Sequence, residues 1–355
     1  MADPFVLQVA VTKGGGGIVT AVVHYNRMFR RAGVSSACLY RGPVAADLRS
    51  EDVAVVAAPR SMTLPFGHLF PDMRAIRADI VRRAGGAPLV AIIHSDLALP
   101  VIRGLFRDAV TVAPCHSDKF ARKKSADIVL TLNTLQHDAI SAGLRGCKAR
   151  AVMLGNPFVS TRADAGPTSE GAPRINFCAR FTEVKNPRLL LEAAKLIPSA
   201  TQFRFIGEGE LGDEIRAATA ESANIVCLPW RSDPFADFHR GDILVLPSLW
   251  EGLPYAVQEA LNLGIPVIAS DNAGNRAALG DGLYGRLFPS GDAAALARCI
   301  EEATADLAPL RARAAAGHKA LRERYGAEAF WKQLKRCTEQ VSRNRLAHAA
   351  SPQDA

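Results

Sequence analysis

The stretch WEGLPYAVQEALNLGIPVIAS, residues 250–270, decides how the second half of the chain is interpreted. The preceding segment, DILVLPS, has the apolar and β-branched composition of a buried strand. Pro254 favours the first turn of a helix, where its missing N–H costs no hydrogen bond, and Gly264 favours the end of that helix. The stretch therefore predicts a strand, a loop that carries Glu251, a helix that contains Glu259, and a further strand.

The same alternation of strand and helix patterns runs along the whole chain. FVLQVAV (residues 5–11) is typical of a buried strand, and GIVTAVVHYNRMFRRAG (residues 17–33) is typical of an amphipathic helix. RINFCARF (residues 174–181) begins a second series of strands and helices. Alternating elements favour parallel strands joined by right-handed crossovers. We therefore predict an α/β chain with two Rossmann-like, doubly wound parallel-sheet domains.

Length and composition favour two compact domains. A chain of 355 residues exceeds one ordinary domain, and 48% hydrophobic with 22% charged residues is the balance of a globular protein. The segment between the two series is rich in Pro, Gly, Ser and Thr and has no periodicity, as in a linker. We predict an N-terminal domain over residues 1–157, a linker over 158–173, a C-terminal domain over 174–325, and a C-terminal helix and tail over 326–355 that pack back on the N-terminal domain.

The cysteines and the start of the chain favour a cytoplasmic protein. The seven cysteines lie far apart, with no CxxC pair and no Cys/His cluster at zinc spacing, which favours reduced thiols. The first residues lack the basic segment and long apolar run of a signal peptide, and the sequence has no run of about 18 apolar residues that could span a bilayer.

The excess positive charge lies in the first half of the chain. Residues 1–165 carry 21 Lys and Arg against 12 Asp and Glu, whereas the remainder carries 22 against 23. Such an excess favours anionic partners, for example a membrane surface, nucleic acid or a phosphorylated substrate. A solvated basic face without a partner is the open alternative.

Two segments have the composition of anion-binding loops. KGGGGI (residues 13–18) follows the first strand, and its central Gly15 and Gly16 would let backbone N–H groups approach an anion at a helix start. It matches neither the P-loop nor the dinucleotide-binding pattern, and a turn without a ligand is the alternative. RFTEVKNP places Arg180 and Lys185 after the first strand of the second series, where two cations suit a diphosphate. Two surface cations without a ligand are the alternative there.

Further candidate residues follow later strands of the second series. FIGEGE places Gly207 and Gly209 after one strand, and LPW places Trp230 after the next. Between the two glutamates lie the backbone N–H groups of Gly252 and Leu253 in the loop and of Tyr255 at the start of the helix. Capping of the helix explains Glu251. It does not explain an acid at Glu259, which lies between Ala256, Val257, Ala260 and Leu261.

PSLWEGLPYAVQEALNLGIPVIASDNAGNRAAL (residues 247–279) resembles the E-x7-E signature of the retaining nucleotide-sugar glycosyltransferases of family 4. The resemblance extends over residues 174–292, and more loosely to KGGGG, IIHSD and VAPCHSD in the first half. It implies the GT-B fold, in which two Rossmann-like domains face each other across a cleft. Ala179 and Asn186 depart from the family, which often has glycine at these positions, and neither change removes a charge.

The resemblance implies a role for each candidate residue. Glu259 would bind the ribose hydroxyls, Glu251 would hold the donor sugar, and Arg180 and Lys185 would neutralise the diphosphate leaving group without a metal or other cofactor. His116 would lie beside the donor sugar; a structural role for this histidine, as for His94, is the alternative. The loop with Gly15 and Gly16 would face phosphate or acceptor, and the backbone around Trp230 would contact the base.

The activity implied is the retaining transfer of a sugar from a nucleotide-diphosphate sugar, UDP-linked, to a glycan or a polyprenyl- or lipid-linked acceptor, in bacterial-type polysaccharide or glycolipid biosynthesis. The basic first half would dock peripherally on the anionic inner face of the plasma membrane. A sugar-nucleotide epimerase or hydrolase of the same fold is the enzymatic alternative. The non-enzymatic alternative is a basic nucleic-acid-binding protein. Only 6% of the residues are aromatic, and this alternative would leave the second half of the chain unexplained. We therefore expect no nucleic-acid partner.

Overall fold

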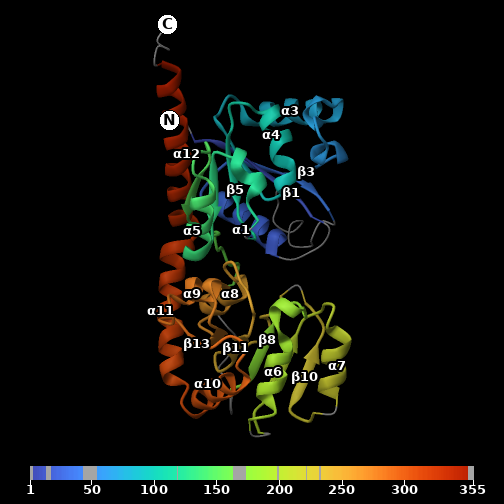
Figure 1. Ribbon diagram of the computed structural model, residues 1–355, viewed down its shortest axis with the longest axis vertical. Helices are drawn as coiled ribbons and strands as arrows, with labels where there is room; N and C mark the ends of the chain where they lie inside the picture. The colour runs from blue at the N-terminus through green and yellow to red at the C-terminus, as the bar shows by residue number, and fades with distance from the viewer. Residues whose placement is uncertain are drawn as a thin grey trace. The chain divides into compact units, whose positions relative to one another are not determined.

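The computed structural model describes residues 3–12, 17–42, 54–117, 119–162, 173–197, 200–220, 222–231 and 233–350, with side chains to residue 347. The chain divides into two compact units (Figure 1). The first comprises Met1–Val159 together with Arg324–Ala355, and the second comprises Ser160–Glu323. Each unit is built on its own parallel sheet.

The first unit contains a seven-stranded sheet in the order β3-β2-β1-β4-β5-β6-β7, with every neighbouring pair parallel. Its strands are β1 (Phe5–Val11), β2 (Ser36–Arg41), β3 (Val55–Ala57), β4 (Leu89–Ile93), β5 (Val110–Pro114), β6 (Ile128–Thr131) and β7 (Arg150–Met153). Its longer helices are α1 (Gly17–Arg31), α3 (Pro71–Ala84), α4 (Leu99–Leu105), α5 (Thr134–Gly143) and α12 (Ala327–Ala350).

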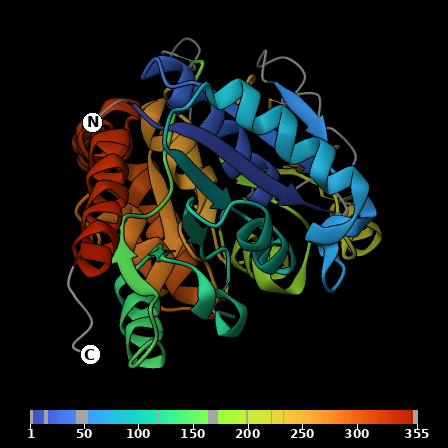
Figure 2. The same cartoon turned by 90° about the horizontal axis from the view of Figure 1, so that it is seen from above.

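Helices cover both faces of this sheet, which explains why its central strands are apolar on both sides. On one face, Leu7 of β1 belongs to the same core as residues of α3 and α4; Figure 2 shows α3 running alongside β1. On the other face, α12 packs against α1. The ring centroids of Phe29 and Trp331 are 5.6 Å apart, and those of Tyr25 and Phe330 are 5.7 Å apart. The first unit is therefore a doubly wound α/β layer closed by the last helix of the chain.

The second unit contains a six-stranded parallel sheet in the order β10-β9-β8-β11-β12-β13. Its strands are β8 (Ile175–Cys178), β9 (Phe203–Ile206), β10 (Ile225–Leu228), β11 (Ile243–Leu246), β12 (Val267–Ser270) and β13 (Arg286–Phe288). Its helices are α6 (Pro187–Ala194), α7 (Gly212–Ala220), α8 (Tyr255–Asn262), α9 (Ala273–Leu279), α10 (Ala293–Ala305) and α11 (Ala308–Tyr325), of which α11 continues two residues beyond the boundary of the unit. Phe177 and Phe205 stack in its core with ring centroids 5.7 Å apart.

One detail of the opening stretch was predicted wrongly. Pro254 does not lie in the first turn of α8 but precedes the helix in an extended conformation, with φ −71° and ψ 120°. The helix begins at Tyr255, because Pro254 itself has an extended backbone. Among the residues that the structure describes, no helix is long and apolar enough to cross a membrane.

Candidate active site

The candidate residues of the second unit follow four neighbouring strands. Arg180 follows β8, Gly207 follows β9, Trp230 follows β10 and Glu251 follows β11. Because all these strands are parallel, the loops leave the same edge of the sheet, the carboxyl edge at which open α/β sheets bind ligands. The sheet order thus brings together residues that are 71 positions apart in the chain, counted from Arg180 to Glu251.

An ion pair joins the loops after β8 and β11. Lys185 Nζ lies 2.5 Å from Glu251 Oε1, and the side chains are 21% and 7% exposed. A carboxylate this deeply buried needs a counter-charge, which the lysine supplies. The resemblance assigned the two residues to different parts of a ligand, whereas in the structure each is the other's partner.

The loop that carries Glu251 is fixed by the end of β12 and the segment that follows it. The carbonyl of Ser248 accepts hydrogen bonds from Ser270 Oγ and, at 3.0 Å, from Asn272 Nδ2. A Cβ on Gly274, in the first turn of α9, would lie 2.3 Å from the carbonyl oxygen of Glu251. Gly274 therefore allows the helix to pack directly on the backbone of Glu251. This support was not predicted, although Asn272 followed by Ala-Gly-Asn is typical of a capped helix start.

The two glycines after β9 have a packing role. A Cβ on Gly207 would lie 2.0 Å from the carbonyl oxygen of Ala179, and a Cβ on Gly209, whose φ is +155°, would lie 2.4 Å from the carbonyl oxygen of Phe181. These contacts flank Arg180 on both sides. The glycines therefore let the loop after β9 lie against the backbone that carries the arginine, an explanation that needs no ligand contact.

Arg180 itself is exposed, and no side chain among the described residues forms an ion pair or hydrogen bond with its guanidinium. The loop closes at Asn186, which has the left-handed φ of 50° and ψ of 53°. Asparagine tolerates this conformation better than most residues, and glycine tolerates it best. The departure from glycine at this position therefore preserves the course of the loop.

Helix α8 places Glu259 on its second turn, partly buried. Burial and, second, the negative charge of Glu259 raise the pKa of Cys178 at the end of β8 above its ordinary value. The charge of Glu259 is therefore felt at Cys178, the last residue of the strand that precedes Arg180. Gly252 and Leu253 are buried, Tyr255 is partly buried, and Trp230 is exposed.

The candidate residues of the first unit lie at the carboxyl edge of its own sheet. His116 follows β5, and its Nε2 lies 3.0 Å from Nδ1 of His94, which follows β4. Burial and then the charge of Lys123 lower the pKa of His116 to about 4. Gly15 and Gly16 lie outside the described residues.

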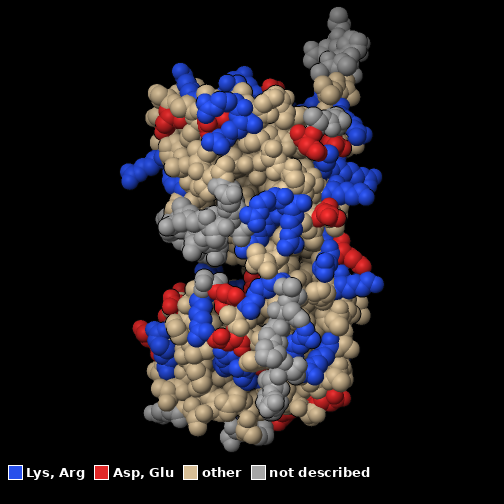
Figure 3. Space-filling model, turned by 180° about the vertical axis from the view of Figure 1, so that it is seen from behind, with Lys and Arg blue, Asp and Glu red and all other residues tan. Residues whose placement is uncertain are grey.

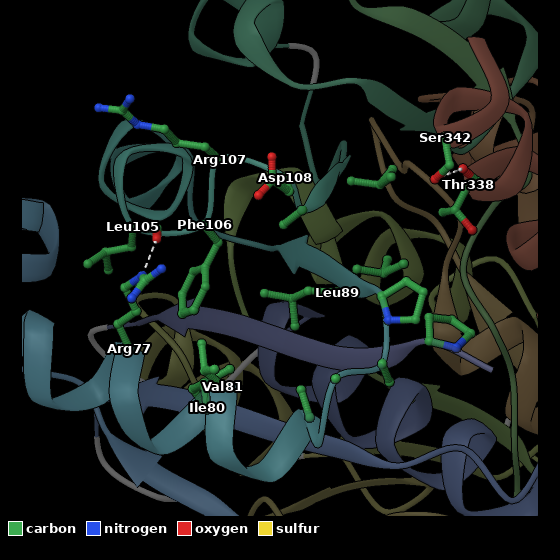
Figure 4. A pocket seen from close by; sticks show the side chains of 18 of the residues that line it. Arg77, Ile80, Val81, Leu89, Leu105, Phe106, Arg107, Asp108, Thr338 and Ser342 are labelled. Atoms are coloured by element: carbon green, nitrogen blue, oxygen red, sulfur yellow. Dashed lines mark hydrogen bonds between the residues drawn. The ribbon is translucent and has the colours of Figure 1, made fainter. Parts of the chain in front are cut away.

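A pocket of about 660 Å³ lies elsewhere in the first unit, at the amino ends of β4 and β5. Figure 4 shows it between α3, with Ile80 and Val81, and α12, with Thr338 and Ser342. None of the predicted site residues lines it. On the face shown in Figure 3, Lys and Arg side chains lie among Asp and Glu side chains over both units. Among the described residues, no group of three or more His, Cys, Asp or Glu has the arrangement of a metal site.

Comparison with known proteins adds sequence evidence to this geometry. Residues 172–306 match the family described as Glycosyl transferases group 1. The matched stretch contains Arg180, Lys185, Glu251 and Glu259. It lies entirely within the second unit, so the similarity to glycosyltransferases falls on the part of the chain with the ion pair and the exposed arginine.

Two curated relatives are themselves glycosyltransferases. The chain is 33% identical to the UDP-Gal:alpha-D-GlcNAc-diphosphoundecaprenol alpha-1,3-galactosyltransferase of Escherichia coli, over 36% of this chain and 35% of that protein. It is 27% identical to the amylovoran biosynthesis glycosyltransferase AmsK of Erwinia amylovora, over 52% of this chain and 50% of that protein. The chain therefore spans between a third and a half of the length of these relatives.

A solved structure covers both units. The crystal structure of Anabaena Alr3699/HepE in complex with UDP and glucose has a TM-score of 0.74 and 16% identity, and covers 95% of this chain and 100% of that chain. At this identity the likeness concerns the fold. The prediction of two Rossmann-like parallel-sheet domains of the GT-B type is confirmed.

Proposed function

We propose that the chain is a retaining, metal-independent glycosyltransferase of family 4 that moves a sugar from a UDP-linked donor to a hydroxyl of a glycan or of a polyprenyl- or lipid-linked acceptor. The observation that carries the proposal is the convergence of an exposed arginine, Arg180, and the Lys185–Glu251 ion pair at the carboxyl edge of the second sheet. The process would be bacterial-type polysaccharide or glycolipid biosynthesis.

In this proposal the two cations bind the diphosphate of the donor. Arg180 is available for bidentate contact with phosphate oxygens, and Lys185 supplies a second positive charge. As the bond between the sugar C1 and the phosphate oxygen breaks, negative charge grows on the diphosphate, and the two cations stabilise it. The new bond between C1 and the acceptor oxygen forms on the same face, and the acceptor's proton passes to the departing phosphate.

The glutamates hold the rest of the donor. Glu259 accepts hydrogen bonds from the ribose hydroxyls, and Glu251 accepts them from the sugar while it keeps Lys185 in place. Backbone groups of Gly252 and Tyr255 lie between them in sequence, beside the phosphates. The backbone around Trp230 contacts the base. Neither glutamate transfers a proton, so loss of either should weaken donor binding first.

The names of the relatives support the finer parts of the proposal. The Escherichia coli relative is named for a UDP-linked galactose and a diphosphoundecaprenol acceptor. The Anabaena structure was solved with UDP and glucose. On the basis of these names and of the predicted roles of the site residues, we propose a UDP-linked donor and a lipid-linked acceptor for this chain as well.

Calorimetry with UDP tests the proposed donor site. Glu259→Gln should weaken UDP binding about tenfold, because a hydrogen bond to a charged group contributes roughly 1.5–3 kcal/mol. Glu192→Gln, an exposed glutamate of α6, is the matched control and should bind as the wild type does. Equal affinity in both variants would refute the ribose role of Glu259.

Product analysis separates the proposed reaction from its alternatives. Purified protein would be incubated with a labelled UDP-sugar, with and without a polyprenyl-diphosphate-linked glycan. Transfer predicts a labelled glycan that retains the anomeric configuration of the donor. Free sugar or an altered nucleotide sugar, independent of acceptor, would instead indicate a hydrolase or an epimerase.

We also propose that the first unit associates peripherally with the anionic inner face of the plasma membrane. Four large apolar side chains are exposed in one short segment, namely Leu64, Phe66, Leu69 and Phe70. Phe66 is 73% exposed and has the left-handed φ of 56°, which is costly for a bulky residue. The nearby Arg74, also exposed, provides charge that complements anionic lipid.

Sedimentation with vesicles tests this association. Wild-type protein should sediment with phosphatidylglycerol vesicles more than with phosphatidylcholine vesicles, and Phe66→Ser should reduce the bound fraction. Leu196→Ser, an exposed apolar residue of the second unit, is the matched control. Equal sedimentation with both kinds of vesicle would exclude electrostatic docking.

A further inference from the structure

A buried chain of hydrogen bonds runs from α1 through β1 to the loop after β5. Gln8 Nε2 donates to Asn26 Oδ1, and Gln8 Oε1 lies 3.2 Å from His94 Nε2. His94 Nδ1 lies 3.0 Å from His116 Nε2. Gln8, Asn26 and His94 are each at most 3% exposed, so water cannot replace these contacts. Burying such groups is costly unless they bond to each other.

The chemistry of the amide gives the chain a direction. Since the amide nitrogen of Gln8 donates to Asn26, its carbonyl oxygen faces His94, and His94 must carry its proton on Nε2. A neutral imidazole has one donor and one acceptor, so Nδ1 of His94 is an acceptor. His116 must then donate from Nε2, which leaves its own Nδ1 without a proton.

Both imidazoles are neutral around pH 7, so each has one nitrogen that donates and one that accepts. Burial, then the charges of His116 and Lys123, hold the pKa of His94 well below its ordinary value. Burial and Lys123 lower the pKa of His116 to about 4. Lys123 forms an ion pair with Asp96. A doubly protonated imidazole, which would donate from both nitrogens, is therefore excluded at neutral pH.

We propose that Gln8 and His94 are positioning residues that hold His116 in the tautomer with its proton on Nε2, so that Nδ1 accepts a hydrogen bond from a substrate hydroxyl. His116 is partly exposed, and within the described part of the chain no group bonds to its Nδ1. That the hydroxyl belongs to a substrate rests on the proposed glycosyltransferase function. The tautomer of His116 follows from the hydrogen bonds alone and does not depend on that function.

The proposed tautomer has a consequence for specificity. A nitrogen without a proton can accept from a hydroxyl but cannot donate to a carboxylate, a phosphate or a carbonyl oxygen. His116 would therefore favour a neutral sugar hydroxyl at its position and disfavour an anionic group such as the carboxylate of a uronic acid. Reversing the amide of Gln8 would reverse every bond in the chain and this preference with it.

Nitrogen NMR of the full-length protein labelled with ¹⁵N-histidine tests the tautomer directly. Two histidines serve as internal references. His24 Nδ1 accepts from the Val159 N–H at 3.0 Å and so carries no proton, whereas His318 Nδ1 lies 2.8 Å from the carbonyl oxygen of Asn262 and must carry one. We expect His94 and His116 to show the pattern of His24 at neutral pH. A protonated Nδ1 on His116, as in His318, would overturn the proposal.

A variant tests whether Gln8 positions His116. Gln8→Met keeps the length of the side chain and removes its polar atoms, so the proton of His116 should no longer be confined to Nε2. Unchanged patterns for His24 and His318 would show that the variant is folded. An unchanged pattern for His116 in that folded variant would refute the positioning role.

Kinetics then test the acceptor role apart from the tautomer. In the His116→Gln variant the amide nitrogen of the glutamine occupies the position of Nε2 and can still donate to His94. The variant has no hydrogen-bond acceptor at the position of Nδ1. With a neutral UDP-sugar, kcat/KM should fall about tenfold, the effect of one hydrogen bond of roughly 1.4 kcal/mol. An unchanged kcat/KM would refute the contact with the hydroxyl. The NMR result uses no substrate and is independent of the proposed function.

Discussion

Both units place polar side chains at the carboxyl edge of a parallel sheet. In the second unit the candidate residues Lys185 and Glu251 form an ion pair, whereas in the first the candidate residues are two neutral imidazoles near the ion pair of Lys123 and Asp96. Lys185 and Glu251 keep opposite charges 2.5 Å apart. His94 and His116 lie at a similar distance, 3.0 Å, but burial and Lys123 prevent them from gaining charge. Under the proposed function, the second unit would bind the charged diphosphate through Arg180 and Lys185, and the first would contact neutral hydroxyls through His116.

Removal of the carboxylate from the ion pair should have the largest effect. Glu251→Gln keeps the shape of the side chain, but the amide binds sugar hydroxyls and Lys185 more weakly than the carboxylate does. We expect transfer activity to fall about a hundredfold, the loss of roughly 3 kcal/mol from charge-assisted hydrogen bonds. Glu302→Gln is the matched control, because Glu302 forms a surface ion pair with Arg286 away from the site. Initial rates with a UDP-sugar measure both, and equal rates would contradict the role of Glu251.

The neutral histidines of the first unit should make it sensitive to acid. The pKa values of His24, about 3, and His116, about 4, lie below the ordinary value of 6.5. The unfolded chain therefore binds protons that the native chain does not, and stability that is fully present above about pH 6.5 is lost as the pH falls through 4 towards 3.

His116→Gln should reduce this acid sensitivity. Between pH 6.5 and 4, the free energy of unfolding of this variant should fall less steeply with decreasing pH than that of the wild type. The two slopes should differ by at most about 1.4 kcal/mol per pH unit, the largest contribution of one titrating group. Urea unfolding at several pH values, followed for the whole chain, provides the measurement. A variant with the same pH profile as the wild type would show that His116 is not held neutral.

The packing behind the ion pair should matter next. Gly274→Ala places a methyl group 2.3 Å from the carbonyl oxygen of Glu251, so the helix or the loop must move. We expect a loss of about 1–3 kcal/mol in stability, which is typical of overpacking, and weaker UDP binding. Gly17→Ala is the matched control, because a Cβ on Gly17 meets nothing within 4 Å. Thermal unfolding compares the two, and an equal melting temperature would contradict the close packing.

Much of the fold could be predicted from the sequence, because both sheets are built from apolar runs separated by helical patterns. Short elements such as β13 (Arg286–Phe288) and α9 (Ala273–Leu279) were not predicted, since three to seven residues carry little periodicity. The signature around Glu251 and Glu259 predicts which loops form the candidate site, and that assignment stays a prediction. It could not show that Lys185 bonds to Glu251, which depends on β8 and β11 being neighbours in the sheet.

The hydrogen-bond chain of the first unit also could not be predicted from the sequence. Gln8 lies within the apolar run FVLQVAV, where a single polar residue gives no indication of its partners. Its contacts with Asn26 and His94 arise because β1, α1 and the loop after β4 meet in space. The packing role of Gly207 and Gly209 is of the same kind, since a close approach of two backbones leaves no pattern in either segment.

Binding of UDP to a single lysine variant tests the central claim most directly. Lys185→Met removes the cation that Glu251 holds at the carboxyl edge of the second sheet, and Lys195→Met, at an exposed position after α6, is its matched control. Calorimetry should show that UDP binds the wild type and Lys195→Met equally and binds Lys185→Met at least about tenfold more weakly, as expected for a lost charge-assisted contact. No binding of UDP to the wild type, or equal affinity in all three proteins, would contradict a diphosphate site at this edge.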